Sequence, residues 1–161
     1  MDDRTTVDLY VLNEQADQAR SIADPNGFCY ENSDSSLTSF TFDEVNYGKL
    51  DFLDQLTAAG IAYDSRWSNG CEFTAGVEHL RFTEDGTPVA MEVSDDEHHI
   101  SLDCLEQAME RPDALEHLRC VVAKLKKETI PLPWDNQVEY GKIYRTKQLI
   151  TGNTKQLTSN T

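Results

Sequence analysis

Apolar and polar residues alternate along much of the first two-thirds of the chain, with the period of two that is typical of half-buried β-strands. This alternation predicts strands at residues 7–12, 37–45, 61–67, 71–75, 77–82 and 89–93. Apolar residues at helical spacing predict helices at 13–23 and 49–59, and Gly60 stands where a helix can end in the left-handed conformation. The Asp85-Gly86 pair predicts a tight hairpin between the last two strands, because both residues tolerate the positive φ angles of such a turn. The sheet is therefore expected to be antiparallel.

The connecting segments and the last third of the chain are less regular. Asn13 is expected to cap the first helix, and the polar residues 31–36 are expected to form a loop. Two further helices are expected to begin near Ser101 and near Pro112, because proline suits the first turn of a helix. One side of the second of these helices carries Leu115, Leu118, Val122 and Leu125. Residues 138–150 are compatible with either a strand or a helix.

Together these segments predict a single α+β domain. Its antiparallel sheet is expected to contain about five to six strands, packed with two to four helices. The domain is expected to span residues 1–150 and to be followed by a disordered polar tail at 151–161. A length of 161 residues suits one domain of this kind.

The sequence also indicates a compartment. The N-terminus has no basic region followed by an apolar region, which a secretory signal requires, and no run approaches the ~20 apolar residues of a membrane span. The cysteines, which show no C-x-x-C spacing, are Cys29, Cys71, Cys104 and Cys120. We therefore expect a cytoplasmic protein with four reduced thiols, of which Cys104 and Cys120 lie in apolar helical settings typical of a core.

Charge changes this picture from a generic domain to one with a preferred class of partner. The formal net charge is −15, and it is unevenly placed. Residues 1–110, the acidic body, contain 24 acidic and five basic side chains, whereas residues 111–161 contain five acidic and nine basic ones. Such a body repels DNA, RNA and anionic membranes, so direct binding to any of them is not expected. Basic proteins are its natural counterparts.

Candidate catalytic chemistry is sparse. The chain has no phosphate-binding loop, no dinucleotide fingerprint and no nucleophile elbow, and no cofactor is predicted. The densest group of metal-ligating residue types is the run from Asp95 to His99. It supports one enzymatic alternative, a small metal-dependent hydrolase centred on Asp96, His98 and His99. We prefer to interpret the same residues as a solvated loop before the helix that begins near Ser101.

The acidic residues carry the leading hypothesis. Duplex DNA presents one negative charge per ~1.7 Å of its axis, and a carboxylate-rich surface can imitate that density inside a cationic groove. The hypothesis is therefore a non-enzymatic binding or inhibitor protein that engages a basic partner, such as a nucleic-acid-binding enzyme or a defence complex, by DNA mimicry. The predicted partner-binding residues are Asp43, Glu44, Asp51, Asp54, Trp67, Glu72, Glu92, Asp95, Asp96 and Glu97. Tyr47, Trp67 and Phe73 are aromatic residues among these acids that could anchor the interface or belong to the core.

Two other interpretations stay open at this point. The acidic surface could serve only to keep the protein in solution. The chain could also be a regulatory subunit, whose basic C-terminal part docks on an acidic partner or on the acidic body of a second copy as a homodimer.

Overall fold

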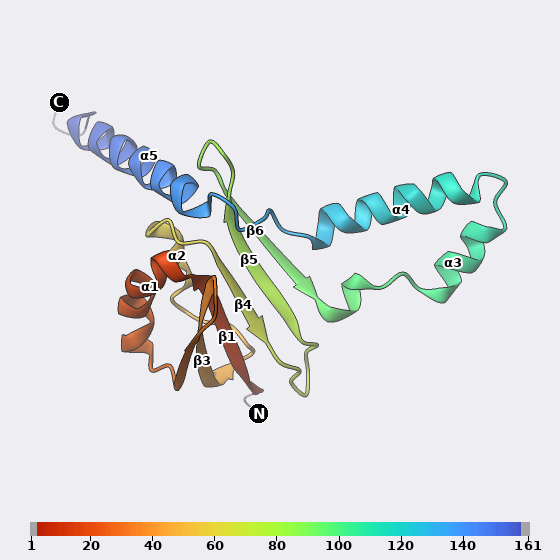
Figure 1. The fold of residues 1–161 in the computed structure, drawn as a ribbon, viewed down its shortest axis with the longest axis horizontal. Coiled ribbons are helices and arrows are strands. Elements are labelled where there is room, and N and C mark those ends of the chain that lie inside the picture. The colour runs from red at the N-terminus through yellow and green to blue at the C-terminus, as the bar shows by residue number, and fades with distance from the viewer. Residues whose placement is uncertain (1–2, 159–161) are drawn as a thin grey trace.

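The structure, a computed structural model, describes the backbone of residues 3–158 and their side chains except those of Asp96, His98 and residues 152–158. One antiparallel sheet of six strands, in the order β2-β3-β1-β4-β5-β6, forms the centre of the molecule (Figure 1). The strands are β1 (Arg4–Leu12), β2 (Tyr30–Ser33), β3 (Leu37–Asn46), β4 (Tyr63–Trp67), β5 (Gly76–Phe82) and β6 (Pro88–Ser94). The α-helices of the described residues are α1 (Ala16–Ala23), α2 (Leu53–Ala58), α3 (Leu102–Met109), α4 (Ala114–Thr129) and α5 (Gln137–Thr158), and the 3₁₀ helices are η1 (Asn13–Gln15), η2 (Asp24–Asn26) and η3 (Asp95–His98).

The predicted fold class, α+β with an antiparallel sheet, is confirmed. The sheet has the upper number of strands expected, and the described residues contain five α-helices where two to four were expected. The hairpin predicted at Asp85-Gly86 joins β5 to β6, and Gly86 has a φ of 79°. Gly60 follows α2 in the left-handed conformation, as its position predicts.

The hydrophobic core lies on one face of the sheet, beneath α1 and α2. Strand β1 places Val7, Leu9 and Val11 on this face, and all three side chains are fully buried. Phe42 and Phe40 lie opposite the first two of them on β3 and belong to the same cluster. Successive side chains of a strand point to opposite faces, so the alternation of apolar and polar residues in the sequence matches the alternation of buried and more exposed side chains along β1. Each such side chain contributes about 1.5–3 kcal/mol by leaving water.

Helix α5 closes one end of this core. Tyr140 and Tyr144 pack against the core cluster, and the rings of Tyr144 and Phe82 have centroids 5.2 Å apart. Gln137 is buried and binds the backbone of Phe82 twice. The Phe82 amide donates to Oε1 of Gln137 at 2.7 Å, and Nε2 of Gln137 donates to the Phe82 carbonyl at 3.0 Å. The start of α5 is thereby fixed to the end of β5.

Helix α5 also includes the segment whose secondary structure the sequence leaves ambiguous. Residues 138–150 are helical throughout. Helix α5 continues to Thr158, into the segment 151–161 for which the sequence predicts a disordered tail, and residues 159–161 lie outside the described residues. Its second half extends beyond the sheet (Figure 1). No helix in the described part of the chain is both long enough and apolar enough to cross a membrane.

The opposite face of β4 and β5 carries a buried charged network. Oδ1 of Asp64 lies 2.6 Å from Nδ1 of His79 and 2.8 Å from Nη2 of Arg81, and all three side chains are buried. The Arg81 guanidinium lies 3.6 Å from the centroid of the Trp134 ring and donates to the Leu132 carbonyl. Arg81 therefore ties the segment between α4 and α5 across the sheet.

Electrostatics within this network favour the charged pair. Burial opposes ionisation of Asp64, but the hydrogen bond with His79 and the positive charge of Arg81 outweigh it, so the pKa of Asp64 lies below its usual value. Burial also lowers the pKa of Arg81, and Asp64 counteracts this effect. Asp64 and Arg81 therefore form a buried ion pair, and His79 is a second hydrogen-bond partner of Asp64.

Three local predictions are wrong. Residues 31–36 are not all loop, because strand β2 pairs with Thr38–Thr41 at the edge of the sheet. Residues 71–75, predicted as a strand, form a loop between β4 and β5. Asn13 does not cap α1 with its side chain, which instead donates to the Asp34 carbonyl at 3.0 Å.

The cysteines differ from expectation in their burial. All four are free thiols, as predicted. Cys104 is only half-buried and Cys120 is exposed, so neither is a core residue. The reason is the position of α3 and α4, which extend away from the sheet as a hairpin (Figure 1).

Candidate functional site

Three aromatic residues and two carboxylates for which the sequence predicts a role in binding or in the core lie around one hollow at the edge of the sheet. We call it the aromatic-acidic pocket. Its volume is about 400 Å³, and it is lined by Tyr47, Lys49, Trp67, Glu72, Phe73, Thr74, Glu92 and Ser94. The loop after β3, the end of β4, the loop 68–75 and strand β6 each contribute to it. Residues far apart in the sequence therefore converge on this site.

Trp67 is held in place by two glycines. A Cβ atom added to Gly48 would lie 2.6 Å from Cβ of Trp67, and one added to Gly76 would lie 2.6 Å from Cζ2 of its ring. Gly48 also has a φ of 66°, a conformation that other residues adopt only with strain. The indole Nε1 donates to the Thr74 carbonyl at 2.9 Å. The half-buried ring is thereby fixed in one orientation beside the pocket.

Asp3 positions the loop that carries Glu72 and Phe73. Its carboxylate accepts the amide of Cys71 at 2.9 Å and the amide of Glu72 at 2.7 Å. Its carbonyl accepts the amide of Tyr47 at 2.9 Å. These bonds take up amides that a strand would offer to its neighbour, which explains why the loop is not a strand. They also bring Phe73 to Tyr47, with ring centroids 6.3 Å apart.

The charges at the pocket are unbalanced. Glu72 is exposed and forms no ion pair within the described residues. Glu92 is paired with Lys49 at 3.4 Å, and about half or more of each of these two side chains is exposed. Lys49 is the sole lysine or arginine among the described residues lining the pocket. A weak, solvent-exposed ion pair of this kind contributes about 0–1 kcal/mol, so it can be exchanged readily.

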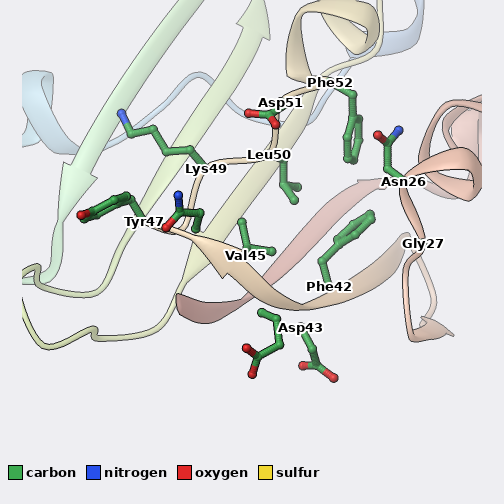
Figure 2. Close-up of a pocket in the computed structure, with 12 residues that line it drawn as sticks. Asn26, Gly27, Phe42, Asp43, Val45, Tyr47, Lys49, Leu50, Asp51 and Phe52 are labelled. Carbon is green, nitrogen blue, oxygen red and sulfur yellow. The ribbon is translucent and has the colours of Figure 1, made fainter. Parts of the chain in front are cut away.

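A second hollow of about 490 Å³ adjoins the first and shares Tyr47 and Lys49 with it. Figure 2 shows its apolar floor, where Phe42, Leu50 and Phe52 point toward one another. Asp51 lies at its edge, while Asp43 points away from this floor on the other side of β3 (Figure 2).

The backbone beside the second hollow adopts a conformation that non-glycine residues seldom take. Glu44 has a φ of 57° and Tyr47 a φ of 50°. Strained residues of this kind persist where the surroundings fix them, and they are concentrated at binding sites.

The predicted partner-binding residues thus fall into three groups. Trp67, Glu72 and Glu92 line the aromatic-acidic pocket. Asp43, Glu44 and Asp51 belong to the segments around the adjoining hollow, although the side chain of Asp43 points away from its floor. The others are not among the described residues that line either hollow. These are Asp54 in the first turn of α2, and Asp95, Asp96 and Glu97 in η3.

Within η3 the described side chains have other surroundings. Asp95 lines a separate cleft beneath Trp134, and Glu97 accepts the amide of Ser94 at 2.8 Å. The side chains of Asp96 and His98, which the metal-site alternative requires, lie outside the described residues, and His99 is exposed. Among the side chains that the structure describes, no three of the types His, Cys, Asp and Glu are grouped to hold a metal ion.

Sequence reasoning missed the residues that build the pocket rather than those that line it. Asp3, Gly48 and Gly76 act through contacts with segments up to 69 positions away, which no local pattern encodes. The sequence identifies Lys49 only as one of the five basic residues of the acidic body and does not place it beside Glu92.

The arrangement has a definite chemical preference. Aromatic faces beside carboxylates attract a cation, because the ring quadrupole and the carboxylate charge act in the same sense. A lysine or arginine side chain meets both requirements, since its aliphatic stem packs on rings while its charged end reaches the acids. Comparison with known proteins adds no family to this description, because the chain matches no family model, no curated protein and no solved structure.

Proposed function

We propose that this protein is a non-enzymatic binding or inhibitor protein, whose acidic body engages a cationic surface on a protein partner. The observation that carries the proposal is the aromatic-acidic pocket, in which Trp67 and Phe73 lie beside Glu72 and Glu92. Net charge alone would fit a protein that is merely kept in solution. A pocket in which rings and carboxylates converge favours recognition of a cationic side chain.

Binding begins with attraction at long range. Charges on the acidic body accelerate the encounter with a basic surface, and salt screens them beyond about 8 Å at physiological ionic strength. A lysine or arginine of the partner then enters the pocket, places its stem on Trp67 and its charge between Glu72 and Glu92. In doing so it displaces Lys49 from its ion pair with Glu92.

The distribution of charge supports a class of partner. A groove that binds nucleic acid is lined with lysine and arginine at close spacing, and a carboxylate-rich body competes for it. We therefore propose a nucleic-acid-binding enzyme or a defence complex as the partner, with inhibition by DNA mimicry. The acidic body has 24 carboxylates against five basic side chains, of which Arg81 is buried and paired internally.

Substitutions in the pocket are expected to change affinity in opposite directions. The double variant Glu72→Gln/Glu92→Gln should bind an oligolysine peptide about tenfold more weakly, because two carboxylate contacts worth up to about 1 kcal/mol each are lost. Lys49→Gln should bind the same peptide more tightly, because the competing internal cation is removed. Isothermal titration calorimetry at low salt measures both effects.

The matched control is Glu14→Gln/Asp24→Asn, which removes two exposed charges near α1, away from the pocket. It should change affinity less than the pocket variant does. Equal losses for the two double variants would mean that overall charge alone governs binding and would reject the pocket.

A further inference from the structure

Helices α3 and α4 form a hairpin that stands apart from the sheet (Figure 1). We call residues 101–129 the helical arm. It leaves the body after η3 and returns where residue 130 begins the extended segment beneath Arg81. Ala108 and Thr129 are the only buried side chains among its residues, all of which the structure describes. The arm therefore has almost no core of its own.

The arm nevertheless carries a continuous apolar stripe. Leu115, Leu118 and Val122 follow one another at intervals of three and four residues, which is the spacing of a coiled-coil seam. Leu115 is 65% exposed and Val122 38% exposed. A shallow groove of about 440 Å³ runs along this face, lined by Leu115, Leu118, Arg119, Val122, Ala123 and Lys126.

Helix α3 repeats the pattern at a smaller scale. Leu102, Leu105 and Met109 have the same spacing of three and four, and Leu102 and Met109 are 69% and 74% exposed. Helices of eight and 16 residues gain most of their stability from burying an apolar face. Exposed leucines at seam spacing on both helices indicate that another helical surface covers them.

The distribution of charge on the arm favours a second copy of the same arm as the covering surface. The exposed residues Asp103, Glu106 and Glu110 make α3 and the residue after it acidic, and they have no ion pair within the described residues. The last turns of α4 are basic, and Lys126 and Lys127 are likewise unpaired within the described residues. One arm thus carries both halves of a complementary pair. This is the requirement for a self-complementary, two-fold interface.

Repulsion between copies leads to the same conclusion. Two chains with a net charge of −15 repel each other wherever their acidic bodies meet. The helical arm contains five basic and six acidic side chains, so it is nearly neutral. Two arms can therefore meet at a lower electrostatic cost than two acidic bodies.

We propose that the helical arms of two copies pack together as an antiparallel four-helix bundle and make this protein a homodimer. In this bundle the apolar stripe of α4 packs on that of the second copy, and the acidic α3 of each copy lies beside the basic end of α4 of the other. The two acidic bodies are thereby held apart. The proposal is independent of the proposed function, because it involves none of the pocket residues.

Analytical ultracentrifugation of the full chain tests the proposal. The expected mass is twice the 18.2 kDa of the chain, falling to the single-chain mass on dilution. The variant Leu115→Glu/Val122→Glu should have the single-chain mass at every concentration, because it places charges in the seam. Its circular dichroism should still show the folded body, since both side chains are exposed in one chain.

The matched control is Leu149→Glu/Ile150→Glu, which changes two exposed apolar residues of α5 outside the arm and should remain dimeric. A wild-type protein that is monomeric at all concentrations would overturn the proposal. So would a dimer that survives Leu115→Glu/Val122→Glu but is lost in the α5 control.

Discussion

Replacing Arg81 with alanine is expected to lower the free energy of unfolding by about 3–5 kcal/mol, because the change leaves a buried charge without its partner. Arg81 is 2% exposed. Its guanidinium binds Asp64 at 2.8 Å and donates to the carbonyls of Tyr63 and Leu80, each at 2.9 Å. Without it Asp64 keeps its contact with His79 but loses its cationic partner, the two carbonyls lose this donor, and the Trp134 ring loses the cation stacked on it. Urea unfolding followed by tryptophan fluorescence and by circular dichroism measures the change.

Arg66→Ala provides the control for this experiment. Arg66 lies on the same face of the neighbouring strand β4, but it is exposed, and its guanidinium lies 5.6 Å from the centroid of the Tyr10 ring. Its replacement should cost about 1 kcal/mol or less. Equal stabilities of Arg81→Ala and Arg66→Ala would contradict the assignment of Arg81 as the residue that ties the segment between α4 and α5 to the sheet.

Gly141→Ala is expected to destabilise the protein by about 1–3 kcal/mol, although alanine is the better helix former by about 1 kcal/mol. A Cβ atom at this position would lie 1.9 Å from the Gly60 carbonyl oxygen. The clash is with backbone, which cannot rotate away, and Gly60 is itself fixed by its φ of 68°. Helix α5 would have to move off the end of the core. Thermal unfolding and fluorescence of the core aromatics detect this movement.

Lys142→Ala tests the same helix without the clash. Lys142 is exposed and its ion pair with Glu139, at 2.7 Å, is a surface pair, so its replacement should change stability by no more than about 0.5 kcal/mol. If Gly141→Ala stabilised the protein as helix propensity alone demands, the close packing of α5 on Gly60 would be wrong.

The sequence predicts those parts of the fold in which local preference and tertiary packing agree. Val7, Leu9 and Val11 alternate with polar residues, and their strand lies with one face on the core. The hairpin at Asp85-Gly86 is confirmed because its turn chemistry is local. Ser101 caps α3 by accepting the amide of Cys104 at 3.2 Å, which again depends on neighbours in the sequence.

Elements that depend on distant partners are missed. Strand β2 lies at the edge of the sheet and is polar, so its composition gives no strand signal. Its backbone is held in the strand conformation by pairing with β3. The loop 71–75 has the composition of a strand, but the carboxylate of Asp3 binds its amides. The local sequence of 138–150 fits a strand or a helix, and the helix is favoured because it packs Tyr140 and Tyr144 on the core.

The candidate site shows the same division. The sequence predicts Trp67, Glu72 and Glu92 as partner-binding residues, because an aromatic residue among acids could anchor an interface, and all three line the pocket. The sequence does not predict that these residues converge. They do so because Gly48 and Gly76, which have no side chains, allow segments from separate strands and loops to pack closely on Trp67. The buried network of Asp64, His79 and Arg81 is likewise invisible until β4 and β5 are paired.

The most direct test of the central claim is the salt dependence of binding. Affinity of the full chain for an oligolysine peptide is measured by calorimetry at about 50 mM and about 500 mM salt, with an uncharged peptide of equal length as the control. We expect affinity to fall by about tenfold or more between these conditions, and the uncharged peptide not to bind, because attraction to the acidic body drives the encounter. An affinity that is the same at both salt concentrations, or equal binding of the uncharged peptide, would contradict recognition of a cationic partner by the acidic body.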